Sequence, residues 1–227
     1  MTEYFMRAVI FDLDGTLIDS APDIAAVLNR VLMADGLEPL AGDEVRTMIG
    51  DGAKVLLERA FAARGAVAGA PHLAAFIADY EANPVVETVP YAGIVQALAL
   101  LAEAGYPLGV CTNKPIGPTR RILDVLGLNP FFGAVVGGDS TPYRKPDPRH
   151  LAVALDELAA REAVMIGDHE NDILAATGLG QPSIFVRWGY GRAEASYTAD
   201  TPMELPGLIR EIPMGEEISG VVSCISG

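Results

Sequence analysis

Residues 8–16 form the stretch AVIFDLDGT, in which an apolar run meets two acids. The first four residues predict a buried strand, which ends abruptly at Asp12 and Asp14. Side chains two positions apart on a strand project to the same face. Two carboxylates on one face repel each other unless a cation or a shared proton relieves them. The pair therefore indicates chemistry, and the alternative is a turn that merely ends the strand.

Composition restricts the possible partners. The 227 residues include 30 Asp and Glu against 16 Lys and Arg, and the formal charge of -14 argues against nucleic acid or an anionic membrane surface. Cys111 and Cys224 provide neither a disulfide framework nor zinc-site spacing. No segment has 18 uninterrupted apolar residues, and the N-terminus lacks a basic-then-apolar signal. We expect a cytoplasmic protein with no membrane or nucleic-acid partner.

The segment from Ser20 to about Tyr80 is predicted to be helical throughout. Apolar residues recur at spacings of three and four, and Gly36, Gly50 and Gly65 follow them where helices typically end. The segment SAPD, which begins at Ser20, predicts a capping box. No strand-like run interrupts this block.

After residue 91 the pattern alternates between strands and helices. Short apolar runs predict strands at 108–111, 134–136, 164–166 and 183–186. This alternation predicts a parallel sheet covered on both faces, that is, a doubly wound, Rossmann-like α/β core.

The helical block is predicted to be an insertion, because one strand precedes it and the other strands follow it. We expect a core made of residues 1–17 and 91–227, with an α-helical cap of residues 18–90 inserted after the first strand. The Gly/Ser-rich tail from 215 to 227 has no assignment.

Polar residues follow four predicted strands at their carboxyl ends, where open α/β sheets bind ligands. These residues are Asp12 and Asp14, then Thr112, Asn113 and Lys114, then Lys145, and finally Asp168 and Asp172. Each residue has a plain structural interpretation as a turn residue, a solvated charge or a helix cap. Groups suited to phosphate and a hard cation at all four ends are much harder to explain by chance. The set predicts a catalytic phosphate site.

The residue types suit phosphoryl transfer. A phosphate monoester resists nucleophiles because its oxygens are negative, so catalysis depends on positioning and charge stabilisation. Asp12 and Asp168 can hold Mg²⁺, while Lys145 and the Thr112 hydroxyl can hold phosphoryl oxygens. A carboxylate nucleophile forms an acyl phosphate that water can cleave. A second acid two residues away can protonate the leaving alkoxide.

These residues resemble, in order, the four motifs of the haloacid dehalogenase superfamily. The matching positions are residues 12–16, Thr112, Lys145 and residues 167–172. The resemblance implies an α/β core with an inserted cap and an Mg²⁺-dependent reaction through an aspartyl phosphate.

The same resemblance implies particular roles. Asp12 would be the nucleophile and Asp14 the acid and base. Mg²⁺ would be held by Asp12, by the carbonyl of Asp14 and by Asp168, with Asp172 supporting the metal site. The transferring phosphoryl group would be bound by Thr112, Asn113 and Lys145.

A finer resemblance is to bacterial phosphoglycolate phosphatases, and it spans most of the chain. It rests on residues 19–23, 112–115, 137–140, 144–146 and 171–173. Two residues depart from that family's pattern, since Asp51 stands where Asn is commoner and His169 where Ser is commoner. The implied substrate is 2-phosphoglycolate, and the alternatives are a sugar phosphate, a nucleotide or pyrophosphate.

The predicted cap contains the segment RTMIGDGA, residues 46–53, which is similar to that family's substrate-facing loop. Arg46 suits a carboxylate, and Gly50 and Gly52 allow close backbone approach, so we expect these three residues to contact the substrate. The alternative is an ordinary helix charge and two glycines that end a helix.

Three other functions compete with a phosphatase. A 2-haloacid dehalogenase expels halide without metal or proton, which leaves Asp14, Asp168 and Asp172 without a role. A phosphosugar mutase would use the same aspartyl phosphate and exclude water. A regulatory module would not need the intact set of acids with Lys145. We expect Mg²⁺ as cofactor, a small anionic phosphate ester as partner, and a monomer or small homo-oligomer.

Overall fold

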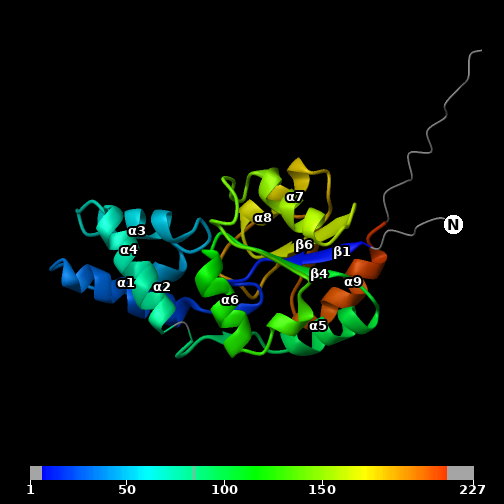
Figure 1. Ribbon diagram of the computed structural model, residues 1–227, viewed down its shortest axis with the longest axis horizontal. Helices are drawn as coiled ribbons and strands as arrows, with labels where there is room; N and C mark the ends of the chain where they lie inside the picture. Colours follow the sequence, from blue (N-terminus) through cyan, green and yellow to red (C-terminus); the bar gives the residue numbers. More distant parts are fainter. Residues whose placement is uncertain (1–6, 84, 214–227) are drawn as a thin grey trace, which may run out of the picture.

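The computed structural model describes residues 7–83 and 85–213. Its core is a six-stranded parallel sheet in the order β5-β4-β1-β6-β7-β8 (Figure 1). The strands are β1 (Ala8–Phe11), β4 (Leu108–Cys111), β5 (Ala134–Val136), β6 (Ala163–Gly167), β7 (Ser183–Val186) and β8 (Tyr197–Ala199). β1 lies in the middle, where Phe11 pairs with Val110 of β4 and with Ile166 of β6. The carboxyl ends of these three strands therefore lie side by side.

Helices cover both faces of the sheet (Figure 1). They are α5 (Ile94–Glu103), α6 (Ile116–Val125), α7 (Pro148–Glu157), α8 (Glu170–Gly178) and α9 (Leu205–Glu211), with the 3-10 turns η1 (Asn129–Phe131) and η2 (Pro202–Glu204). Val9 and Phe11 join one apolar core with α5, α6 and α9, while Ala8 and Ile10 join a second core with α7 and α8. The strand is apolar throughout because both of its faces are covered. The predicted doubly wound α/β fold with inserted helices is confirmed.

The inserted helices lie beyond one end of the sheet (Figure 1). They are α1 (Ala21–Ala34), α2 (Gly42–Arg46), α3 (Ala53–Ala62) and α4 (Ala70–Ala82). α1 packs against α2 and α4, and α3 packs against α4. Their apolar faces are buried against one another, as the helical spacing predicts.

A short antiparallel ribbon joins these helices to the sheet. It consists of β2 (Ile18–Asp19) and β3 (Val89–Pro90), in which Ile18 pairs with Pro90. The ribbon lies at the two predicted boundaries of the insertion, next to residues 17 and 91. The division of the chain into 1–17 with 91–227 and 18–90 stays a prediction.

The predicted capping box at the start of α1 is wrong. The hydroxyl of Ser20 makes no capping bond and instead donates to Oδ1 of Asp14 at 2.5 Å. Asp23, the other half of the box, accepts hydrogen bonds from the backbone N–H groups of residues 86, 87 and 88 and from the Thr88 hydroxyl. Both side chains prefer tertiary partners to the helix end that local sequence suggests.

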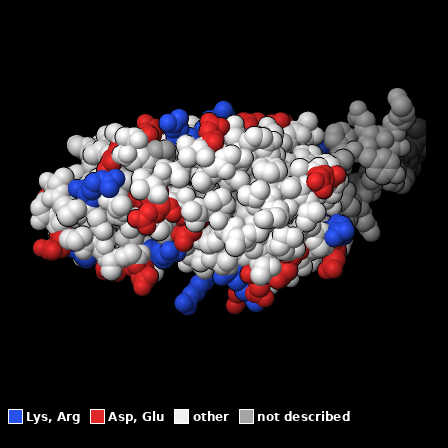
Figure 2. Space-filling view, turned by 90° about the horizontal axis from the view of Figure 1, so that it is seen from below, with Lys and Arg blue, Asp and Glu red and all other residues white. Residues whose placement is uncertain are grey.

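The face of the molecule in Figure 2 carries small groups of both charges around an uncharged centre. Within the described part of the chain, no helix is both long and apolar enough to cross a membrane. The tail from 215 to 227, with Cys224, and the first six residues lie outside the described residues.

Candidate active site

The three central strands deliver the predicted site residues to one place. Asp12 directly follows β1, Thr112 directly follows β4 and Asp168 directly follows β6. Because β1 lies between β4 and β6, these residues lie next to one another at the carboxyl edge of the sheet. Asp172 joins them from the first turn of α8.

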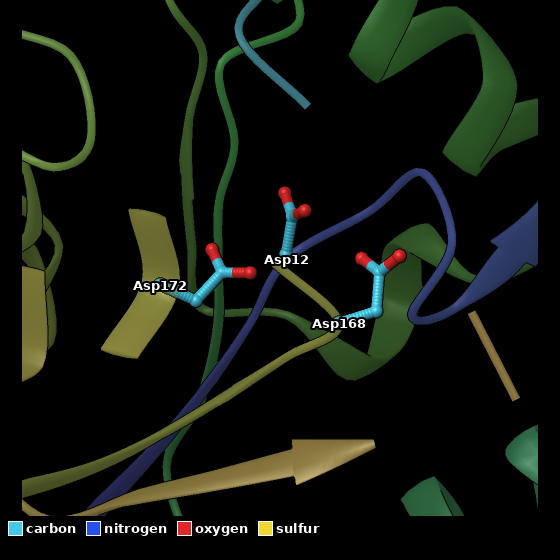
Figure 3. A group of neighbouring side chains, drawn as sticks. All are labelled: Asp12, Asp168 and Asp172. Carbon is cyan, nitrogen blue, oxygen red and sulfur yellow. The ribbon is translucent and has the colours of Figure 1, made fainter. Parts of the chain in front are cut away.

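Three buried carboxylates converge at this edge (Figure 3). Asp12, Asp168 and Asp172 each offer an oxygen within 4.8 Å of the other two. Lys145 Nζ lies 2.9 Å from Oδ1 of Asp12 and donates to Oδ1 of Asp172 at 2.6 Å. Three negative groups therefore face one positive group in a setting that is shielded from water.

The electrostatics of the cluster reflect this imbalance. Burial, with the charge of Asp12 added, raises the pKa of Asp168 to about 6. Burial also raises the pKa of Asp172, against the opposing charge of Lys145. Burial alone would lower the pKa of Lys145, but Asp12 and Asp172 outweigh it and that pKa is raised. A bound cation would relieve the remaining negative charge.

The donor set suits a hard divalent cation. All the candidate ligand atoms are carboxylate oxygens, and the buried Oδ1 of Asp12 has the ion pair with Lys145 but accepts no hydrogen bond with good geometry from a described residue. The backbone also packs closely against this cluster, because Gly15 has a φ of +83° and a Cβ there would lie 2.3 Å from Oδ2 of Asp168. The residues present therefore fit a metal ion of the Mg²⁺ type.

Asp168 is fixed by three hydrogen bonds. The Thr16 hydroxyl donates to its Oδ1 at 3.2 Å, and the backbone N–H groups of Tyr190 and Gly191 donate to its Oδ2 at 2.7 and 3.1 Å. The Tyr190 side chain continues from there to the ribbon, where its hydroxyl accepts from the N–H of Ser20 at 2.7 Å and donates to Asp19 at 2.8 Å. One loop thus connects a candidate metal ligand with the start of the inserted helices.

Asn113 holds the backbone of Lys145. Its side-chain amide donates to the Lys145 carbonyl at 2.9 Å and accepts from the Lys145 N–H at 2.9 Å. The same amide donates to the Gly50 carbonyl at 3.1 Å. The structure therefore places the Asn113 side chain between Lys145 and the inserted helices, and its predicted contact with phosphate stays a prediction.

The comparisons with known proteins agree with this geometry. Residues 6–180 match the family model of haloacid dehalogenase-like hydrolases. The chain belongs to this family. The phosphoglycolate phosphatase of Caulobacter vibrioides is 46% identical over 188 residues, which cover 80% of this chain and 79% of that protein. The phosphoglycolate phosphatase of Rhodospirillum rubrum is 43% identical over 196 residues, which cover 82% of this chain and 81% of that protein.

A solved structure extends the likeness to the fold. The crystal structure of a predicted phosphoglycolate phosphatase from Haemophilus somnus superposes with a TM-score of 0.83 at 27% identity, covering 90% of this chain and 98% of that one. The resemblance that the four motifs indicated is therefore confirmed. The relatives are named as phosphatases within a hydrolase family, so the predicted enzyme class, a hydrolase of phosphoric monoesters, is confirmed.

The second acid of this haloacid dehalogenase-like site, Asp14, is held by residues from both parts of the chain. Lys114 Nζ donates to its two oxygens at 2.9 and 3.0 Å, and the Ser20 hydroxyl donates to Oδ1. Lys114 also donates to the Tyr80 hydroxyl of α4 at 3.1 Å. Lys114 belongs to the predicted set of polar residues at the strand ends, although the sequence assigns it no role. Ser20 and Tyr80 are not among the predicted site residues.

The predicted contact loop of the inserted helices reaches the core. Gly50 has a φ of +126°, and a Cβ there would lie 2.5 Å from the His169 ring, so only glycine fits this approach. Gly52 lies against the carbonyl of Asn113. Between them, Asp51 accepts a hydrogen bond from Asn171 of α8 at 2.7 Å.

Arg46 lies apart from this group. Its guanidinium pairs with Asp19 at 3.2 Å and lies over the Tyr190 ring, 5.2 Å from the ring centre. It does not line the cavity beside Asp12 and Asp14, whereas Gly50 and Gly52 do. The proposed role of Arg46 in substrate binding stays a prediction, and it would require the side chain to leave Asp19.

Proposed function

We propose that this chain hydrolyses a small phosphate monoester, 2-phosphoglycolate in the first place, with Mg²⁺ and through an aspartyl phosphate. The buried cluster of Asp12, Asp168 and Asp172 against Lys145 carries the proposal. The names of the curated relatives support the choice of substrate.

In the first step, a carboxylate oxygen of Asp12 attacks phosphorus and the bond from phosphorus to the ester oxygen breaks. Asp14 gives its proton to the leaving alkoxide, so the products are an alcohol and phosphorylated Asp12. In the second step, Asp14 takes a proton from water as that water attacks phosphorus. Asp12 is released with inorganic phosphate, and the net reaction consumes one ester and one water.

Other residues stabilise the charge on the phosphoryl group. The ammonium of Lys145 already lies 2.9 Å from Asp12, where a transferring group would arrive. The Thr112 oxygen accepts the Lys114 N–H at 3.2 Å, which leaves the Thr112 hydroxyl hydrogen for a phosphoryl oxygen. Asp12 and Asp168, with the Asp14 carbonyl and with Asp172 in support, would hold Mg²⁺. When bound, Mg²⁺ neutralises negative charge on the phosphoryl oxygens.

The inserted helices are proposed to act as a cap that covers the site. The cavity between them and the core has a volume of about 50 Å³, and one buried water needs about 10–15 Å³ on this scale. Its walls include Ile49, Leu56 and Phe76, so the inserted helices present apolar side chains to the substrate. A leaving group of two carbons suits this space better than a sugar or a nucleoside does.

A panel of phosphate esters, assayed for released phosphate with Mg²⁺ and again with EDTA, tests the proposal. We expect 2-phosphoglycolate to be preferred over sugar phosphates, nucleotides and pyrophosphate, and EDTA to stop the reaction. Asp12→Asn should abolish turnover without loss of folding, because an amide is a poor nucleophile. Conversion of a hexose 1-phosphate to its 6-phosphate would instead show a mutase. Phosphate release by a pure Asp12→Asn sample at the wild-type rate would refute the covalent mechanism.

A further inference from the structure

Lys114 is a buried lysine whose role the chemistry above does not use. It follows β4 at the boundary between the core and the inserted helices, and only 7% of its side chain is exposed. Its ammonium has three partners, the two oxygens of Asp14 and the hydroxyl of Tyr80. It also lies over the Tyr80 ring, 4.3 Å from the ring centre. A buried charge of this kind needs a counter-ion at all times.

Lys114 also lines the cavity beside Asp12. Lys114 is the one cationic side chain among the described residues that line it. The helices α1, α3 and α4 contribute the apolar side chains of Ile24, Leu56 and Phe76 to its wall. An anionic group of a substrate would be poorly solvated against that wall and would have a single positive partner.

Lys114 lies beside the acid that is proposed to face the leaving group. Its Nζ is 2.9 and 3.0 Å from the two oxygens of Asp14, and it lines the same cavity as Asp12. A group next to the ester oxygen of a substrate held at Asp12 and Asp14 therefore falls within reach of the ammonium.

We propose that Lys114 determines specificity by binding a carboxylate that lies one carbon from the ester oxygen of the substrate. The substrate carboxylate becomes a negative partner of Lys114 inside the cavity, beside Asp14. Tyr80 supports the ammonium from the cap, and its own hydroxyl hydrogen meets no acceptor among the described residues, so it can also donate to the carboxylate. This inference rests on the proposed phosphatase function and identifies the residue that recognises the substrate carboxylate.

The inference differs from the expectation for Arg46. Arg46 is already paired with Asp19 and lies outside the cavity lining, whereas Lys114 lies inside it. The two residues can therefore be tested against each other.

The test compares two substrates of equal size, 2-phosphoglycolate and the phosphate ester of glycolamide, in which a neutral amide replaces the carboxylate. We expect the wild type to prefer the carboxylate. Lys114→Met should lower kcat/KM for 2-phosphoglycolate by about 10- to 100-fold more than for the amide, which is the usual value of a hydrogen bond to a charged group. Lys114→Gln keeps polar contacts to Asp14 and Tyr80 and gives the same test if the Met variant is poorly folded.

Binding supplies a readout apart from turnover. In the Asp12→Asn background, calorimetry should show that Lys114→Gln weakens binding of 2-phosphoglycolate by a similar factor. Lys54→Met is the matched control, because this cap lysine is 64% exposed. This substitution should change neither the binding nor the kcat/KM of either substrate.

The possible results separate the two claims. Release of phosphate from neither substrate by the wild type would refute the proposed substrate. Turnover of both substrates without a preference, or an equal loss on both in Lys114→Met, would overturn the role of Lys114 and leave it as a residue that orients Asp14. A loss of preference in Arg46→Met but not in Lys114→Met would transfer the role to Arg46.

Discussion

Asn113 and Lys145 exchange two hydrogen bonds, in which the side-chain amide of Asn113 donates to the Lys145 carbonyl and accepts from the Lys145 N–H. The side-chain amide thus pairs with both backbone groups of one residue, as a neighbouring strand does. This pairing fixes the backbone position from which the Lys145 side chain reaches Asp12 and Asp172. A third hydrogen bond, from the Asn113 amide to the Gly50 carbonyl, connects the Lys145 backbone with the loop of the inserted helices.

Asn113→Ala should release this arrangement. The lost partners leave buried backbone groups unsatisfied, so we expect a loss of about 1–3 kcal/mol in the free energy of unfolding. We also expect kcat/KM to fall by at least about tenfold, because Lys145 is no longer held in place. Urea unfolding and steady-state kinetics measure the two effects. Asn129→Ala, at an exposed position, is the control and should change neither by much.

Asp14→Asn should divide the reaction into its two steps. Without an acid, an alkyl ester loses about 10²- to 10⁴-fold in kcat, because its alkoxide must leave unprotonated. An activated aryl phosphate needs no such proton, so its first step should continue and give a burst of phenolate equal to the enzyme present. Slow turnover should follow, since water then lacks its base. Rapid-mixing spectrophotometry detects the burst, and equal losses with both esters and no burst would exclude Asp14 as the acid.

Metal binding should depend on pH in a defined direction. The pKa of Asp168 is raised from its ordinary value of 3.8 to about 6, because the buried site favours the protonated carboxyl group. The metal-free fold is therefore more stable at low pH, where Asp168 is protonated, and it loses this stability as pH rises through about 6. Mg²⁺ binds the ionised form and compensates for the loss. The increase in Tm on adding Mg²⁺ should therefore be larger at pH 7.5 than at pH 5. Asp168→Asn should remove most of the difference, and an equal increase at both pH values in the wild type would contradict it.

Tyr190→Phe should separate stability from metal affinity. The hydroxyl accepts from the N–H groups of Ser20 and Ala21 and donates to Asp19, so its removal should cost about 1–3 kcal/mol of stability. Asp168 is held through the backbone N–H of Tyr190, which phenylalanine retains. Mg²⁺ affinity, measured by calorimetry, should thus change less than about threefold. Tyr197→Phe serves as the control, because that hydroxyl makes no hydrogen bond to a described residue.

Sequence patterns predict the central strands and the residues at their ends, because both are local properties. An apolar run marks β1, and Asp12 follows it wherever the strand is placed. Parallel neighbours then bring Asp12, Thr112 and Asp168 together without further information. The edge strand β8 is harder to find, since Tyr-Thr-Ala is short and partly exposed.

Contacts between distant side chains could not be predicted in this way. Ser20 and Asp23 have the spacing of a capping box, yet stronger partners in Asp14 and the 86–88 backbone take both side chains. Tyr190 belongs to no recognised motif and acts through a loop 170 residues from Ser20. The sequence places Lys114 at the end of its strand, but it does not predict the contact of Lys114 with Tyr80 from the helical insertion.

The ribbon of β2 and β3 has a consequence for how such a chain can diversify. Since Ile18 pairs with Pro90, the chain leaves the sheet and returns to it at adjacent points. Any segment whose two ends lie this close together can be inserted between β2 and β3. The entropic cost of closing the inserted segment rises only slowly with its length. The inserted segment is therefore exchangeable in principle, as a loop tip is in other folds. Mutation and recombination can alter what is recognised there while the acids on the sheet stay in register.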